Sequence, residues 1–124
     1  MSYHQDWLMR QIETQIVMLR WLLTGRKTHV VRAEDVELTT SAEPNRLQLQ
    51  LQLLVRQGQL CQAENLLYEA LENPDRATLE AGVDFYAALN DFSDEALLRA
   101  NFSREEVYEG LQALSDIYGL PYML

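Results

Sequence analysis

The sequence predicts an all-α protein built as a stack of five to six antiparallel helices. Two observations predict this class: apolar residues recur at helical spacing in several separate segments, and residues that start or stop helices punctuate them. The chain has 124 residues, of which 48% are apolar. That length suits one domain, over residues 1–124, with a core that needs neither disulfides nor metal.

The first predicted helix covers residues 5–24. Its apolar residues fall in one stripe about 120° wide; they are Leu8, Ile12, Ile16, Leu19, Leu22 and Leu23. Beside that stripe, Trp7, Met18 and Trp21 form a second, heptad-like flank together with Thr14. A helix with two apolar flanks needs two neighbours, either both in this domain or one of them in a second chain. Trp7, Met18 and Trp21 are therefore the candidate interaction surface.

A long irregular connection is predicted to follow. Gly25 is expected to end the first helix, because glycine adopts a positive φ without strain. Residues 25–43 show no helical period, and their valines and threonines favour extended structure, which leaves a weak hairpin open. A connection of this length is either a functional loop or a tolerated insertion.

Residues 44–57 carry two competing patterns. Four leucines alternate with glutamines, as in a strand, whereas Leu47, Leu51 and Leu54 fit one face of a helix. Helix is favoured, because none of residues 46–54 is β-branched and Pro44 suits the first turn of a helix.

The next two predicted helices lie on either side of a proline. The first follows the break at Gly58 and is expected to end at Asn73-Pro74, since the residue before proline is pushed out of the helical region. The second covers residues 75–91 and contains Gly82. Glycine costs a helix about 1 kcal/mol relative to alanine, so we expect a close helix crossing at Gly82.

The last two helices have the clearest start signals. Ser93 is the expected N-cap of a short helix, and Ser103 begins the final one, over residues 103–118. Ser103 and Glu106 have the spacing of a capping box, and Gly119 is placed to end the helix.

Residues 56–74 resemble the second half of a tetratricopeptide repeat. The resemblance lies in the turn at Gly58, small Ala63 and Ala70 that let two helices approach closely, and large Leu60 and Leu67. About one and a half repeats cover residues 44–100. The resemblance implies stacked helical hairpins, with the N-terminal helix and the 103–118 helix as caps.

The whole chain also resembles an uncharacterised family of short, tetratricopeptide-like helical proteins from Gram-positive bacteria. The residues that carry this resemblance are 6–13, the stretch from Gly58 to Leu67, and 101–111. The family is a domain of unknown function, so the resemblance implies a fold and no activity.

Charge and hydropathy exclude several classes of partner. The net charge is −9, which argues against nucleic acid because an acidic protein repels phosphate. The longest apolar run, residues 16–23, is interrupted by Arg20 and is too short to cross a membrane. Together with a single cysteine and no signal-like N-terminus, this predicts a cytoplasmic protein.

Residues that could carry chemistry are few. No nucleotide-binding, nucleophile-elbow or zinc-protease motif is present. We expect His4 and His29 to be exposed and unrelated, and Cys61 to be a small buried filler. Acidic residues at helix starts are explained by the helix dipole. No catalytic residue, cofactor or metal is therefore predicted.

The leading functional hypothesis is a non-catalytic protein–protein interaction module that binds an extended or helical segment of a protein or peptide partner. One alternative is a structural homodimer formed through Trp7, Met18 and Trp21 of the first helix. The other is a small-molecule binder with a pocket between residues 25–43 and the last helix.

Overall fold

The computed structural model describes residues 2–28 and 45–121, and every regular element within these ranges is an α-helix. The helices are α1 (Ser2–Thr28), α3 (Arg46–Arg56), α4 (Leu60–Ala70), α5 (Arg76–Asn90), α6 (Asp94–Arg99) and α7 (Arg104–Ile117). The predicted all-α class is thus confirmed for the described part of the chain.

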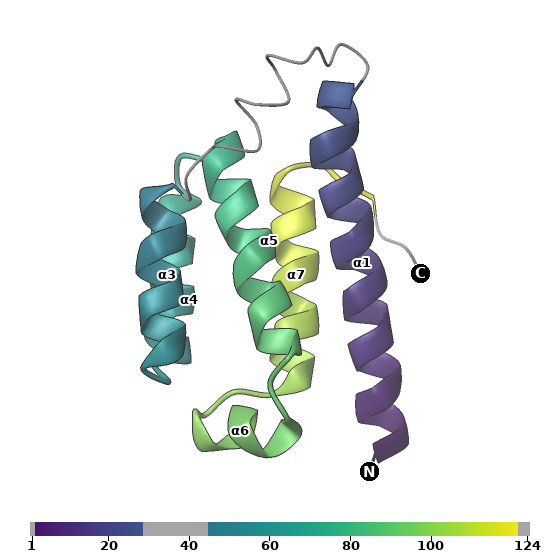
Figure 1. The fold of residues 1–124 in the computed structure, drawn as a ribbon, viewed down its shortest axis with the longest axis vertical. Helices are drawn as coiled ribbons and strands as arrows, with labels where there is room; N and C mark the ends of the chain where they lie inside the picture. Colours follow the sequence, from purple (N-terminus) through teal and green to yellow (C-terminus); the bar gives the residue numbers. More distant parts are fainter. Residues whose placement is uncertain (1, 29–44, 122–124) are drawn as a thin grey trace.

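The long helices form two layers (Figure 1). In one layer α3, α5 and α1 lie next to one another, with α5 in the middle, and α4 and α7 lie behind them. α5 contacts all four other long helices, and the short α6 lies at the end of the bundle where α1 begins. α5 is therefore the central element. The side of α5 that no other helix covers faces solvent between α3 and α1.

The outcome for residues 44–57 is a helix, as predicted. Asn45 is the N-cap: its side chain accepts a hydrogen bond from the backbone N–H of Gln48, whose side chain accepts one from the backbone N–H of Asn45. Leu51 is buried, whereas Leu49 and Leu53 are more than half exposed. One helical face therefore carries the burial, and the alternating strand pattern is coincidental. Pro44 lies outside the described residues.

The expected close crossing at Gly82 is present. A Cβ atom on Gly82 would lie 2.9 Å from Cδ2 of Leu114 on α7 and 3.5 Å from Cδ1 of Leu67 on α4. Leu67 is fully buried, as are Leu60 and Ala63 on the same helix. The absence of a side chain at Gly82 therefore leaves room for Leu114 of α7 and Leu67 of α4 to pack closely on α5.

The predicted helix starts of the last third are confirmed, but the expected capping box at Ser103 is only half formed, because among the described residues no hydrogen bond joins the Glu106 side chain to the backbone N–H of Ser103. The Ser93 hydroxyl accepts from the backbone N–H of Ala96 at 3.1 Å, and the Ser103 hydroxyl accepts from that of Glu106 at 3.2 Å. Gly119 follows α7 with a φ of 64°, and the adjacent N–H of Leu120 bonds back to the carbonyl of Ser115.

Two predicted boundaries are wrong. α1 runs from Ser2 to Thr28 and continues through Gly25, which does not end it. A glycine lowers helix stability, but tertiary contacts along the rest of α1 outweigh one weak position. α4 ends at Ala70, several residues before Pro74, so the proline is not its stop signal. The rest of the expected irregular connection, residues 29–43, lies outside the described residues.

A buried polar contact fixes α1 against α7. Gln15 is 5% exposed, and its Nε2 donates to Oγ of Ser115 at 3.1 Å and to the carbonyl of Pro121 at 2.9 Å. The predicted stripe of Leu8, Ile12, Ile16 and Leu19 is buried on the same side of α1. The opposite side of α1 is consequently turned to solvent.

Candidate functional site

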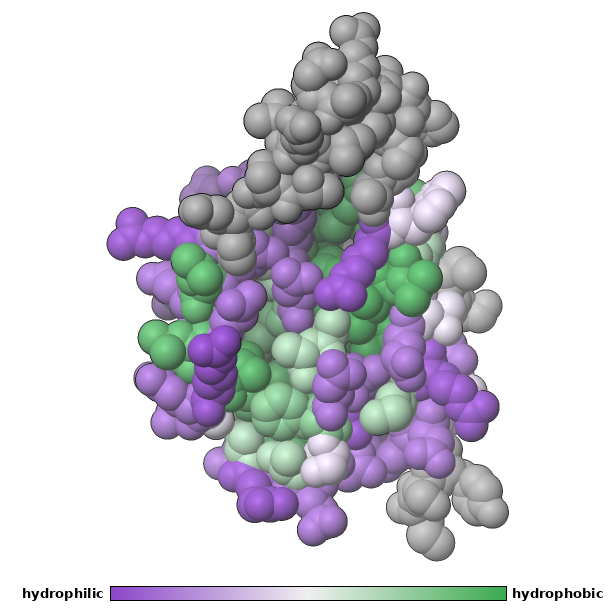
Figure 2. All heavy atoms as spheres, viewed as in Figure 1, coloured by the Kyte–Doolittle hydropathy of each residue, from purple (hydrophilic) through white to green (hydrophobic). Residues whose placement is uncertain are grey.

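A groove of about 520 Å³ lies over the uncovered face of α5, between α3 and α1. We call it the α5 groove. Its lining comes from three helices far apart in the sequence: Arg20 from α1, Gln48, Leu51, Gln52, Val55 and Arg56 from α3, and Ala81, Asp84, Phe85, Ala87, Ala88 and Asp91 from α5 and its C-cap. Figure 2 shows this side of the molecule, where green and paler apolar side chains lie among purple hydrophilic ones.

The groove exists because α5 presents small residues on this face. Ala81, Asp84 and Ala88 recur at spacings of three and four, which places them on one side of the helix. Alanine side chains leave space that a leucine would fill. Phe85, 2% exposed, forms part of the apolar wall toward α3.

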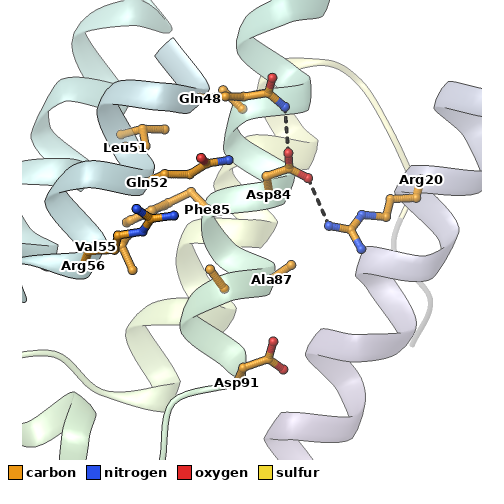
Figure 3. A pocket seen from close by; sticks show the side chains of 12 residues that line it. Arg20, Gln48, Leu51, Gln52, Val55, Arg56, Asp84, Phe85, Ala87 and Asp91 are labelled. Carbon is orange, nitrogen blue, oxygen red and sulfur yellow. Dashed lines mark hydrogen bonds and ion pairs between the residues drawn. The ribbon is translucent and has the colours of Figure 1, made fainter. Parts of the chain in front are cut away.

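Asp84 is the polar centre of the groove (Figure 3). Its Oδ1 lies 3.0 Å from Nη2 of Arg20 on α1, and its Oδ2 accepts a hydrogen bond of 2.6 Å from Nε2 of Gln48 on α3. Both side chains of the ion pair are about half exposed, so the pair is solvated. One carboxylate thereby links the two walls of the groove, and a neighbouring cation balances its charge.

Two other charges in the groove have no such neighbour. Arg56 at the end of α3 and Asp91 at the end of α5 have no hydrogen-bond or ion-pair partner among the described residues. They are of opposite sign and come from different helices, Arg56 from α3 and Asp91 from the end of α5 (Figure 3). The groove therefore offers one positively charged and one negatively charged side chain beside an apolar surface.

The candidate interaction surface on α1 is only partly solvent-facing. Trp7 and Trp21 are 49% and 67% exposed, and Val17 between them is 67% exposed. Met18, by contrast, packs partly against the core. The ring of Trp7 lies 6.5 Å from that of Tyr108 on α7, centroid to centroid. The structure thus places the two tryptophans on one exposed face, as expected from their spacing, and adds Val17, which the heptad-like spacing did not indicate.

A cluster that sequence reasoning missed joins α4 and α5. The carboxylate Oε2 of Glu64 accepts hydrogen bonds from the hydroxyls of Tyr86 at 2.8 Å and Tyr68 at 3.3 Å. Burial raises the pKa of Glu64, and the tyrosine hydrogen bonds oppose that rise in part. Burial also raises the pKa of Tyr86, helped by the charge of Glu64. Gly110 on α7 leaves room for the Tyr86 ring. This cluster is explained by packing.

The expectation for Cys61 is wrong. The residue is exposed, and its Sγ lies 3.6 Å from the carbonyl oxygen of Asn101. Leu60, Ala63 and Leu67 already occupy the inner face of α4, which leaves Cys61 on the outer one. In the described ranges, no group of three histidine, cysteine or acidic residues could hold a metal ion.

The pocket expected between residues 25–43 and the last helix remains a prediction, because residues 29–43 lie outside the described part of the chain. A cavity of about 70 Å³ lies between α1, α5 and the end of α7; it is lined by Leu19, Leu22, Leu23, Leu79, Tyr118 and Leu120. Ligand sites typically have about 300–1,000 Å³. Any contribution of residues 29–43 lies outside the described part of the chain.

Comparison with known proteins adds a family and no activity. A family model described as "Family of unknown function (DUF6483)" matches residues 2–119. No curated protein matches, and no solved structure matches either. Among residues 2–28 and 45–121, no helix combines the length and the hydropathy needed to cross a membrane.

Proposed function

The chain belongs to the DUF6483 family of unknown function, and from this premise we propose that it is a non-catalytic protein–protein interaction module. The α5 groove is the proposed binding site, and a short segment of a partner protein is the proposed ligand. The observation that carries the proposal is the combination of Arg56 and Asp91, both without partners among the described residues, with an apolar groove wall. A surface that combines unpaired charges of both signs with an apolar wall is suited to binding a segment of a protein.

The chemistry of the groove suggests what the segment contains. An acidic side chain would pair with Arg56, and a basic one with Asp91. Small or apolar side chains between them would lie on Phe85 and Val55. Asp84 would contribute little net charge, because Arg20 already balances it. The expected ligand is thus a segment with charges of both signs and an apolar middle.

The helix contacts support a tetratricopeptide-like stack as part of this proposal. α3 packs on α4 as a hairpin, and α5 packs beside α3 as the first helix of a second unit would. In such stacks the first helices of successive hairpins line a concave binding surface. The α5 groove lies on the corresponding side. Origin in Gram-positive bacteria and a cytoplasmic location belong to the same proposal; the latter suits a chain with one exposed thiol.

The proposal is tested by affinity capture with matched variants. The wild-type chain is used as bait in a lysate of the source organism, beside Asp91→Arg, Arg56→Glu and the control Arg99→Glu, which reverses an exposed charge on α6 away from the groove. We expect one protein to be recovered by the wild type and by the control and lost with both groove variants. Titration calorimetry with the segment of that protein protected from proteolysis then measures binding directly.

Two results would contradict the proposal. Recovery of the same proteins by the wild type and the groove variants would show that the α5 groove is not the binding site. Failure to recover any protein across several growth conditions would show that the chain is not an interaction module. Circular dichroism of each variant measures its helix content and so shows whether a loss of binding is due to unfolding.

A further inference from the structure

The exposed face of α1 has a self-complementary pattern. Trp7, Thr14 and Trp21 are separated by seven residues, so they occupy equivalent positions of a heptad. Each tryptophan is therefore seven residues from Thr14, or about 10.5 Å along the helix axis. A pattern that is symmetric about its own midpoint matches a second copy of itself in the antiparallel direction.

We propose that two copies of the chain associate through this face of α1, antiparallel, with the two-fold axis at Thr14. In that register Trp7 of each copy faces Trp21 of the other. The small Thr14 side chain lets the two helices approach at the axis, and its hydroxyl is already bonded to the carbonyl of Arg10 at 2.9 Å. Val17, 67% exposed, gains apolar contact with the stem of Arg10 in the second copy.

Charge complementarity favours a second copy as the occupant. On one edge of the face, Asp6 and Arg20 lie at equivalent heptad positions. Antiparallel pairing about Thr14 brings Asp6 of one copy within about 3 Å, along the axis, of Arg20 in the other. Because of the two-fold axis, the Asp6–Arg20 pair occurs twice in the dimer. Arg20 still exposes 53% of its side chain while it contacts Asp84, so it is accessible to a second carboxylate.

The overall charge distribution points to the same face. The chain carries −9, so most faces of two copies repel each other. From residue 14 to its end at Thr28, α1 contains three Lys and Arg residues and no acid, and the two basic helix ends would lie at opposite ends of an antiparallel pair. Glu13 opposes association, because it lies next to the two-fold axis and its carboxylate lies close to that of Glu13 in the second copy.

The test is the mass in solution, by light scattering or sedimentation over a concentration series. We expect a dimer for the wild type and at least about 30-fold weaker association for Trp21→Glu, since buried tryptophans dominate such interfaces. The control Leu98→Glu changes an equally exposed apolar residue on α6 and should leave the dimer intact. Glu13→Gln should strengthen association.

Charge exchange tests the register. Asp6→Arg and Arg20→Glu should each weaken the dimer, and the double variant should recover it, because the pair is re-formed with its signs reversed. A monomeric wild type, a dimer insensitive to Trp21→Glu, or a double variant weaker than both single ones would overturn the proposal. Trp21→Glu and Asp6→Arg change residues outside the α5 groove, and the groove is tested separately by Arg56→Glu and Asp91→Arg, which leave α1 unchanged.

Discussion

Arg104, the first residue of α7, donates a 2.9 Å hydrogen bond from Nη1 to the backbone carbonyl of Asn90, the last residue of α5. Its Nη2 donates to the carbonyl of Phe92 at 2.9 Å and lies 2.7 Å from Oδ1 of Asp94 on α6. The residue is only 3% exposed. One side chain therefore supplies donors to two backbone carbonyls and a carboxylate where three helices meet, although its own Nε is buried without a hydrogen-bond partner among the described residues.

Arg104→Met should destabilise the fold by about 2–4 kcal/mol, because it leaves buried carbonyl groups without donors. The unfolding free energy from urea titration is the measurement. Arg99→Met removes an exposed arginine on the neighbouring α6 and should cost less than about 0.5 kcal/mol. Equal losses in the two variants would show that the Arg104 contacts contribute nothing specific.

Two glycines at helix crossings should differ in their tolerance of alanine. At Gly82 the new Cβ meets the flexible end of Leu114, which can shift, so Gly82→Ala should cost about 1 kcal/mol after the gain in helix propensity. At Gly110 it meets the ring of Tyr86, which is rigid and fully buried. Gly110→Ala should therefore cost about 2–3 kcal/mol. Thermal melts of both variants measure the two losses of stability. A larger loss for Gly82→Ala than for Gly110→Ala would contradict the packing described.

These positions illustrate what the sequence could predict. A mid-helix glycine is costly, so Gly82 by itself indicated a close crossing of helices. Ser93 and Ser103 indicated helix starts, because capping depends on a few adjacent residues. Local signals of this kind locate the elements and which face of each is apolar.

The α5 groove could not be predicted in the same way. Arg20, Gln48 and Asp84 belong to three helices, and nothing in their spacing says that they meet. The contact depends on the order in which α3, α5 and α1 lie side by side, which is a property of the whole fold. The error at Cys61 has a related cause, since predicting a buried residue there ignored that Leu60 and Ala63 already define the inner face of α4.

Glu64 should make stability depend on pH in the acidic range. Its pKa is raised in the folded state, so the unfolded chain ionises first as pH rises above its ordinary value of 4.5. The contribution of Glu64 is thus fully present below that pH and is lost as pH rises through the higher folded value. Glu64→Gln removes this dependence and should be more stable relative to wild type at pH 7 than at pH 4.

The size of this effect should stay under about 1 kcal/mol, because the carboxylate is only half buried and solvent screens it. Urea titrations of wild type and Glu64→Gln at both pH values measure it. Glu69→Gln, an exposed neighbour on α4, is the control for the change in net charge. A pH dependence shared by all three proteins would assign the effect to another group.

The ion pair in the α5 groove should matter little for stability. Arg20 and Asp84 expose 53% and 42% of their side chains, and exposed pairs contribute about 0.2–1 kcal/mol. Asp84→Asn keeps an oxygen that can accept from Gln48 and loses only the charge that faces Arg20. Its unfolding free energy should therefore fall by less than about 1 kcal/mol, and by less still at 1 M salt, where the Debye length is about 3 Å. A loss of several kcal/mol, unchanged by salt, would mean that Asp84 supports the packing of α1 and α3 rather than the charge balance of the groove.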